Sequence, residues 1–272
     1  LFYYNKIISN HFNKVNFINE NFKSFDHLSP IFVVGLPRSG STLIESIISS
    51  SEIGINSLGE TSVINVSILE QIKEIIFKDG FQEKKFNFTL DLEILNKTVF
   101  KKYKGYIKSP TKNFHFVDKS LENFFNVEII LKIFPSAIFI HCKRNYKDSI
   151  ISIYRSMLPF LPWTHSLKDI VNYIDIYIEV TNFFQKKYPN NFLTINLEDL
   201  TINKIDITKK IFNFCNLEWS EKILKFYKRK NLNVKTLSNK QVRSEIFKYE
   251  KKKYEPYYYL LNDFNEKYEW LK

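Results

Sequence analysis

Cysteine, glycine and methionine are scarce in this sequence of 272 residues, which contains 2 Cys, 6 Gly and 1 Met. Cys142 lies in an apolar run and Cys215 in a helical pattern, which excludes a disulfide framework and a cysteine metal site, and we expect two buried, reduced thiols. Long apolar runs are also missing, since none approaches the about 20 residues that span a membrane. Nothing at the start resembles a signal peptide. We therefore expect a cytoplasmic protein without a transmembrane segment.

Positive charge is in excess, because 40 Lys and Arg residues outnumber 29 Asp and Glu residues and give a net charge of +11. This excess favours anionic ligands. Lys, Asn, Ile and Phe are used so heavily that part of the basicity reflects genome composition, and we predict no nucleic-acid partner.

The chain contains 44% hydrophobic residues, enough to bury a full core. We expect one domain over residues 30–272, preceded by a helical segment over 1–29 that packs on its edge. The sequence begins at Leu1 rather than Met, which indicates a longer natural product and leaves open an upstream targeting signal or domain.

The most informative stretch runs from Ile31 to Glu45. An apolar β-branched run ends at Gly35, a short polar loop follows, and apolar residues return at helical spacing from Leu43 onward. This pattern predicts a strand, a loop of phosphate size and the N-terminus of a helix. Backbone N–H groups and the positive end of the helix dipole then point to one spot, which predicts a site for a phosphate or sulfate group.

Strand and helix patterns alternate along the rest of the chain. Short apolar runs at 137–142 and 192–197 suit buried parallel strands, and residues 116–120 contain a further short apolar piece. Residues 87–92 read as a loop. Helical periodicity covers 63–77, 92–103, 124–134, 146–157, 167–188, 205–215 and 221–230. Strands separated by helices predict a three-layer α/β fold of the P-loop NTPase-like type, with a mainly parallel central sheet flanked by helices.

One position separates the loop from the nucleotide-binding loop of kinases. The spacing from Gly35 to Gly40 and Thr42 fits G-x-x-x-x-G-K-[ST], but Ser41 stands where the lysine is required. That lysine reaches the terminal phosphates of ATP or GTP. The cation is instead Arg38, inside the loop, and no strand ends in the acidic residue of a magnesium site. The sequence therefore favours metal-free transfer of a less charged group from a nucleotide.

Two blocks resemble the sulfotransferases that use 3′-phosphoadenosine 5′-phosphosulfate (PAPS). Residues 35–43, GLPRSGSTL, resemble the family's 5′-phosphosulfate loop, and residues 142–154 resemble its 3′-phosphate segment. The resemblance implies that Arg144 and Ser152 bind the 3′-phosphate. Their spacing allows a strand-end arginine and a serine two helical turns later to reach one anion. It also implies that the loop binds the cofactor through Pro37, Arg38, Ser39, Gly40, Ser41 and Thr42.

Two further segments resemble the tyrosylprotein-type and bacterial TPR-linked sulfotransferases. Glu60 follows the loop helix as the general base does in those enzymes. Lys119 lies in a D-K-x-x-x-N-F segment. The resemblance implies that Lys119 and Arg38 both stabilise the transferring group. On spacing alone, Glu60 would suit an exposed capping carboxylate, and Lys119 would suit a solvated turn equally well.

The C-terminal part departs from the family's pattern in places. Residues 238–243 resemble a Q-V-R region that closes over the cofactor, so Ser238 and Arg243 are expected cofactor ligands. Asn196 and Leu197 replace the aromatic residues of a Y-E-D-L strand end. Any ring that stacks on the adenine must therefore come from elsewhere.

The resemblance implies transfer of a sulfuryl group from PAPS to an acceptor hydroxyl by in-line displacement, with release of adenosine 3′,5′-bisphosphate. The acceptor class stays open between a peptide, a glycan and a small metabolite, as do a homodimer and an N-terminal repeat domain beyond this chain. The alternative is a catalytically inactive regulatory or interaction protein that binds PAPS or its product, and a kinase ranks third.

We expect His141, in a strand, to be a satisfied core residue.

Overall fold

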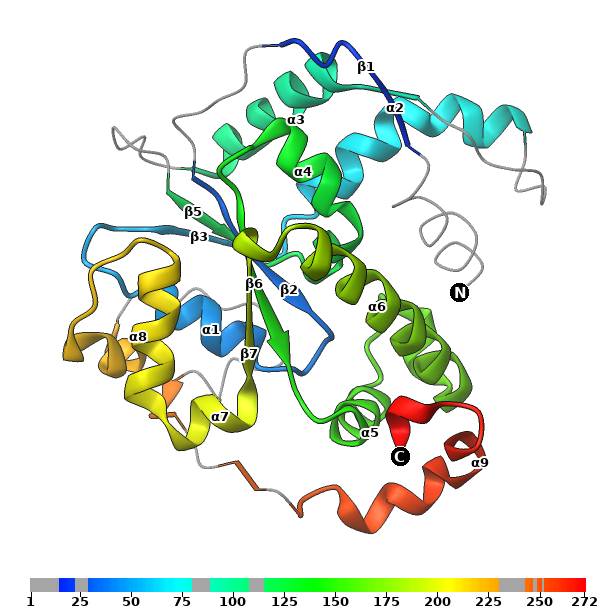
Figure 1. The fold of residues 1–272 in the computed structure, drawn as a ribbon, viewed down its shortest axis with the longest axis vertical. Helices are drawn as coiled ribbons and strands as arrows, with labels where there is room; N and C mark the ends of the chain where they lie inside the picture. The colour runs from blue at the N-terminus through cyan, green and yellow to red at the C-terminus, as the bar shows by residue number, and fades with distance from the viewer. Residues whose placement is uncertain are drawn as a thin grey trace.

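The computed structural model describes residues 15–22, 29–79, 89–107, 115–229, 243–246, 249–250 and 252–272. At its centre lies a five-stranded sheet (Figure 1) with the order β3-β5-β2-β6-β7. All pairings in this sheet are parallel. Its strands are β2 (Ile31–Gly35), β3 (Asn56–Gly59), β5 (Phe116–Asp118), β6 (Ile138–Lys143) and β7 (Phe192–Asn196). The predicted α/β fold with a parallel sheet is confirmed.

The central strand β2 faces a hydrophobic core on each side. Its register with β6 runs from Ile31 opposite Ile138 to Gly35 opposite Cys142. Alternate residues of β2 enter different cores, because successive side chains point to opposite faces: Phe32 belongs to one cluster and Val33 to the other. A strand buried on both faces reads as a continuous apolar run, which explains why its sequence predicted it well.

Helices cover both faces of the sheet and complete three layers (Figure 1). One core includes residues of α2 (Val63–Asp79), α3 (Leu92–Tyr106), α4 (Val127–Ile133), α5 (Tyr146–Ser156), α6 (Leu167–Lys187) and the 3₁₀ helices η2 (Leu121–Asn126), η7 (Glu255–Leu261) and η8 (Glu269–Leu271). The other includes residues of α1 (Ser41–Ile48), α7 (Leu197–Ile202), α8 (Lys204–Phe214) and η5 (Glu221–Lys228). The first core also includes Trp163 of η3 (Pro162–His165). Two further short helices of the described residues are η4 (Pro189–Asn191) and α9 (Asn262–Asn265).

None of the helices in the described ranges combines the length and the apolar character needed to cross a membrane.

The expected helical segment over 1–29 needs correction. Its residues 16–18 form a strand, β1 (Asn16–Ile18), which pairs in parallel with β4 (Thr89–Asp91), where a loop was predicted. Each strand is three residues long and is stabilised by a partner far away in sequence, so local periodicity carries little information about either. Residues 1–14 and 23–28 of the predicted segment lie outside the described residues.

The two cysteines are free and buried, as predicted. Burial raises the pKa of the Cys142 thiol far above its ordinary value and raises the pKa of Cys215 to about 12. Both groups are therefore neutral thiols at physiological pH and poor nucleophiles.

Candidate active site

The loop between β2 and α1 is shaped by two glycines. Gly35 has φ +145°, and a Cβ there would lie 2.5 Å from the carbonyl oxygen of Cys142 on β6. Gly40 has φ +89°, and a Cβ there would lie 2.7 Å from Leu197 at the start of α7. Because only glycine combines these backbone angles with so close an approach, the loop is wedged between β6 and α7.

The start of α1 suits an anion. Ser39 is buried inside the loop, and its hydroxyl donates to the carbonyl of Leu36 at 2.7 Å. Ser41 and Thr42 are buried in the first turn of α1, which contains no acidic residue and has no side-chain cap at Gly40. The positive end of this helix is therefore not neutralised by a side chain of its own first turn.

Two arginines meet at the loop. The Nη1 of Arg144, just after β6, donates to the carbonyl oxygen of Arg38 at 3.2 Å. Burial lowers the pKa of the Arg38 guanidinium; Tyr254 acts in the opposite direction, and the positive charge of Arg144 lowers it further. Two positive charges brought to one loop favour a ligand that carries several negative charges.

The helix α5 presents the second predicted phosphate ligand. Asn145 caps α5, because its side-chain oxygen accepts a hydrogen bond from the N–H of Asp148 at 3.1 Å. Ser152 lies on this helix and is buried. Arg144 precedes the cap and lies 3.6 Å from the Asp148 carboxylate. The structure thus places Arg144 and Ser152 on one strand-to-helix junction, as the sequence predicted.

Three tyrosines from the C-terminal part cover this junction and were missed by sequence reasoning. The Arg144 guanidinium lies over the rings of Tyr249 and Tyr254, 5.3 and 5.2 Å from their centroids. Tyr249 and Tyr258 both donate to the Asp148 carboxylate. They lie about 100 positions after Asp148 in the sequence, so no local pattern connects them with this helix.

The hydroxyl of Tyr254 reaches Ser152 at 3.5 Å. Burial alone would raise the pKa of Tyr254, but its hydrogen bond to Ser152 and the charge of Arg144 lower it below its ordinary value. The contact shows that Ser152 is within reach of a polar group placed beside Arg144.

Lys119 lies between two carboxylates. Its Nζ is 2.5 Å from the nearer carboxylate oxygen of Glu60 and 3.8 Å from that of Glu45. The Lys119 side chain is 1% exposed, whereas that of Glu60 is 53% exposed. An ammonium this buried requires nearby negative charge, and an exposed carboxylate can meet a second substrate. The structure therefore joins the predicted Glu60 and Lys119 directly.

Asp118 holds the turn that carries Lys119. Its carboxylate accepts hydrogen bonds from Thr61 at 2.6 Å, Tyr103 at 2.7 Å and the N–H of Ser120 at 2.7 Å. Contrary to the sequence prediction, one strand of the central sheet, β5, does end in an acidic residue. Donors from three different segments engage its carboxylate and fix this strand end to its surroundings. The predicted Asp-Lys pair is a buried structural turn and not a solvated one.

The family model described as "Sulfotransferase family" matches residues 30–221, most of the chain. The chain belongs to the sulfotransferase family. The matched span contains both predicted anion-binding segments together with Glu60 and Lys119. Membership classifies the chain as an enzyme of the transferase class.

Solved sulfotransferases share its fold. The sulfotransferase domain of the Synechococcus PCC 7002 olefin synthase is 15% identical, covers 84% of this chain and 86% of its own, and has a TM-score of 0.52. The sulfotransferase domain of the curacin biosynthetic pathway is 15% identical, with coverages of 75% and 79% and a TM-score of 0.50. At these identities the likeness concerns the fold, and it confirms the P-loop NTPase-like architecture.

A curated relative is longer than this sulfotransferase chain. An uncharacterized protein of Aquifex aeolicus (strain VF5) is 28% identical over 246 residues, which are 88% of this chain and 32% of that protein. The chain therefore spans about a third of the length of the curated relative that it matches.

Two predicted cofactor ligands of the sulfotransferase fall beyond the family match. Ser238 lies outside the described residues. Arg243 belongs to the short described stretch 243–246 and is exposed. Their roles stay predictions.

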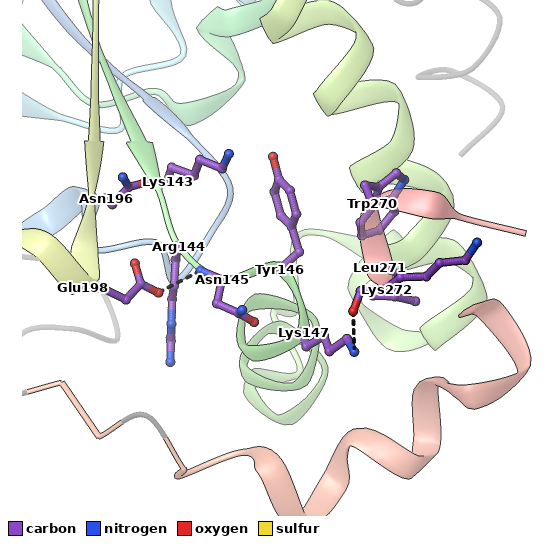
Figure 2. Close-up of a pocket in the computed structure, with 10 residues that line it drawn as sticks. All are labelled: Lys143, Arg144, Asn145, Tyr146, Lys147, Asn196, Glu198, Trp270, Leu271 and Lys272. Atoms are coloured by element: carbon purple, nitrogen blue, oxygen red, sulfur yellow. Dashed lines mark hydrogen bonds between the residues drawn. The ribbon is translucent and has the colours of Figure 1, made fainter. Parts of the chain in front are cut away.

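A cavity of 390 Å³ borders Arg144 at the ends of β6 and β7 (Figure 2). Figure 2 shows Glu198 accepting a hydrogen bond from the backbone N–H of Asn145, at 2.8 Å, and Lys147 donating to the carbonyl of Lys272, at 3.4 Å. Four of its ten lining residues are basic and one is acidic: Lys143, Arg144, Lys147, Lys272 and Glu198. The surface beside the predicted 3′-phosphate ligand is therefore positively charged.

His141 belongs to the core of the sulfotransferase, as predicted. Its Nδ1 lies 2.7 Å from the Gln185 amide nitrogen and 3.1 Å from the Thr194 hydroxyl, and its Nε2 contacts the Tyr177 hydroxyl. Burial, with the charge of Lys143, lowers the pKa of His141 to about 3. The imidazole is neutral and fully engaged at physiological pH.

Proposed function

We propose that this sulfotransferase transfers a sulfuryl group from PAPS to an acceptor hydroxyl by in-line displacement. The observation that carries the proposal is the hydrogen bond from Arg144 to the backbone of Arg38, at 3.2 Å. It couples the cationic loop before α1 to a second cationic junction before α5. A nucleotide with charged groups at both its 3′ and 5′ positions needs two such sites side by side.

The residues present fit this cofactor. The two loop glycines let the loop pack against β6 and α7, and the N–H groups of Gly40, Ser41 and Thr42, at an uncapped helix start without an acidic residue, suit the phosphosulfate end. Arg38 supplies positive charge within the same loop. PAPS, when bound, supplies the sulfuryl group and a bisphosphate leaving group.

Arg144 and Ser152 form the proposed 3′-phosphate site. A guanidinium and a hydroxyl from one strand-to-helix junction would donate charge-assisted hydrogen bonds to that phosphate. Tyr254, which now contacts Ser152, closes the site from the C-terminal part.

Glu60 is the proposed general base. Its exposed carboxylate can accept the proton of an acceptor hydroxyl, and its neighbour Lys119 is a buried ammonium. When Glu60 gains a proton, its attraction for Lys119 falls, and the positive charge of Lys119 becomes available to the negative charge that develops on the transferred group. Arg38, Lys119 and the end of α1 supply the charge stabilisation, so the proposal requires no metal.

The proposed acceptor is a hydroxyl of a peptide, a glycan or a small metabolite. The second candidate, an inactive protein that binds PAPS or its product, would use the same anion sites but would not need the Glu60 carboxylate. The ion pair of Glu60 with Lys119 favours the enzyme.

Cofactor binding is tested with adenosine 3′,5′-bisphosphate. We expect a raised melting temperature in the wild type, and Arg144→Ala should weaken binding about ten- to a hundredfold, because charge-assisted hydrogen bonds are lost. Lys168→Ala, which removes an exposed charge on α6, is the control and should bind normally. No thermal shift in the wild type would refute the proposed cofactor.

Transfer is tested with labelled sulfate, from PAPS to pooled peptide, glycan and small-metabolite acceptors. Glu60→Gln should lower the rate by about a hundredfold or more and leave bisphosphate binding intact. Glu70→Gln is a matched control, since Glu70 is a half-exposed carboxylate 2.7 Å from Lys102 on the neighbouring helix. Unchanged transfer in Glu60→Gln would remove Glu60 as the base, whereas binding without any transfer in the wild type would favour the second candidate.

A further inference from the structure

Glu45 is a buried carboxylate on α1, directly behind the loop. Its side chain is 7% exposed. One carboxylate oxygen accepts hydrogen bonds from the Ser57 hydroxyl at 2.7 Å and from the N–H of Gly59 at 3.1 Å. Both donors lie on β3, which ends immediately before Glu60. Glu45 therefore ties the helix of the anion-binding loop to the strand that presents the proposed base.

The other oxygen of Glu45 faces Lys119. It lies 3.8 Å from Nζ, and the same Nζ lies 2.5 Å from Glu60. The backbone adds a further link, because the N–H of Lys119 donates to the carbonyl of Gly59 at 2.9 Å. One buried ammonium is thus shared by two carboxylates that come from different elements.

Charged and polar groups from two strand ends surround Glu45. Lys119 lies just after β5 and Glu60 just after β3, while the Ser57 hydroxyl and the Gly59 N–H belong to β3 itself. On β6, the buried thiol of Cys142 is also within the field of Lys119. Burial raises the pKa of Glu45, while Lys119 and the two hydrogen bonds oppose that rise and Glu60 adds to it. All of its hydrogen-bonding neighbours are donors, which suits the ionised, acceptor-only form.

We propose that Glu45 is a positioning residue that holds Lys119 between itself and Glu60 and divides the ammonium charge between the two carboxylates. This inference rests on the proposed function, in which Glu60 takes the acceptor's proton. When Glu60 becomes neutral, Glu45 retains its hold on Lys119, so the ammonium stays in the site and is not drawn out toward solvent. The hydrogen bonds of Glu45 to β3 also hold the chain just before Glu60 against α1.

Glu45→Gln tests the inference because it removes the charge and keeps the shape. The amide oxygen can still accept from Ser57 and Gly59, but Lys119 then faces Glu60 alone. We expect kcat to fall about tenfold, through misplacement of Lys119, with little change in the affinity for adenosine 3′,5′-bisphosphate.

Ser57→Ala is the matched control. It removes a hydrogen bond to Glu45 without changing charge, so it should lower the melting temperature and leave kcat close to its wild-type value. A purely structural role for Glu45 would make the two variants behave alike. A wild-type kcat in folded Glu45→Gln would overturn the inference.

A second measurement separates this inference from the proposed function. Nitrogen-15 NMR of the Lys119 ammonium, assigned by its absence in Lys119→Gln, should show faster exchange with water in Glu45→Gln than in the wild type, because the ammonium is held less firmly. This readout needs no acceptor, so it applies even if the wild type transfers nothing, the result that would refute the proposed function instead. If Glu45→Gln does not fold, Glu45→Asp, which keeps the charge but shortens its reach, should speed this exchange, and an unchanged exchange rate would overturn the inference.

Discussion

Gly35 shows how a single residue can shape the site. Its φ of +145° and the 2.5 Å approach of the Cys142 carbonyl leave no space for a side chain. We expect Gly35→Ala to destabilise the fold by about 2 kcal/mol or more, because the backbone of β2 or β6 has to shift. Binding of adenosine 3′,5′-bisphosphate should be lost with it. Chemical denaturation and calorimetric titration measure both effects.

Gly105 provides the contrasting substitution. It lies in α3, and a Cβ there would meet nothing within 4 Å. Gly105→Ala should stabilise the protein by about 0.5–1 kcal/mol, because alanine loses less conformational entropy in a helix. If Gly35→Ala and Gly105→Ala had equal effects on stability, the close approach of the Cys142 carbonyl would not explain the destabilisation by Gly35→Ala.

His141 makes stability depend on pH. Its folded pKa of about 3 lies below the ordinary value of 6.5, so only the unfolded chain gains a proton between these values. The stabilisation is complete above pH 6.5 and is lost as pH falls toward 3. From pH 7 to pH 5 this group should remove roughly 2 kcal/mol of unfolding free energy. His141→Gln has no titrating group at this position, so its unfolding free energy, measured by urea denaturation, should fall less between pH 7 and pH 5. An equal fall in both proteins would contradict this account.

At the scale of elements, α5 is the helix on which the proposed 3′-phosphate site depends. Asn145→Ala removes its cap and should cost about 1 kcal/mol. Fraying of the first turn should also weaken binding of adenosine 3′,5′-bisphosphate, because Arg144 precedes the cap and Ser152 follows it on the helix. Asn145→Asp keeps an acceptor at the cap and should retain stability. Thermal melts and titration calorimetry compare the two, and an equally stable Asn145→Ala would exclude the cap as the anchor.

Elements with a strong local pattern were predictable, and those that depend on distant partners were not. The periodicity of α6 and the continuous apolar runs of β2 and β6 identified them correctly. The strand β1 was taken for helix and β4 for loop, because each is three residues long and exists through pairing with the other. The helix expected over 221–230 is a 3₁₀ helix over Glu221–Lys228.

At the scale of the whole molecule, the net charge of +11 should assist binding of a polyanionic cofactor. Salt screens such attraction, since the Debye length falls from about 10 Å at 0.1 M to about 3 Å at 1 M. We expect the affinity for adenosine 3′,5′-bisphosphate to decrease steadily with added salt, and to decrease less steeply in Arg144→Ala. Titration calorimetry over a salt series measures both slopes; an affinity independent of salt would contradict the role of charge.

The sequence by itself determined the loop, the parallel α/β fold and the family. These depend on short-range patterns: a strand, a glycine loop and a helix in succession, and an arginine and a serine eight positions apart. Glu60 and Lys119 were implied only by the resemblance of two further segments to known sulfotransferases, and their ion pair was not predicted.

Only the tertiary structure decided which charges share a site. Glu45 reads as one polar position in an apolar helix, yet it meets Lys119, a residue 74 positions later, by way of β5. The tyrosines over Arg144 come from the far end of the chain in the same way. Such contacts arise from the order of strands in the sheet and from packing across its edge, and neither is encoded in local periodicity.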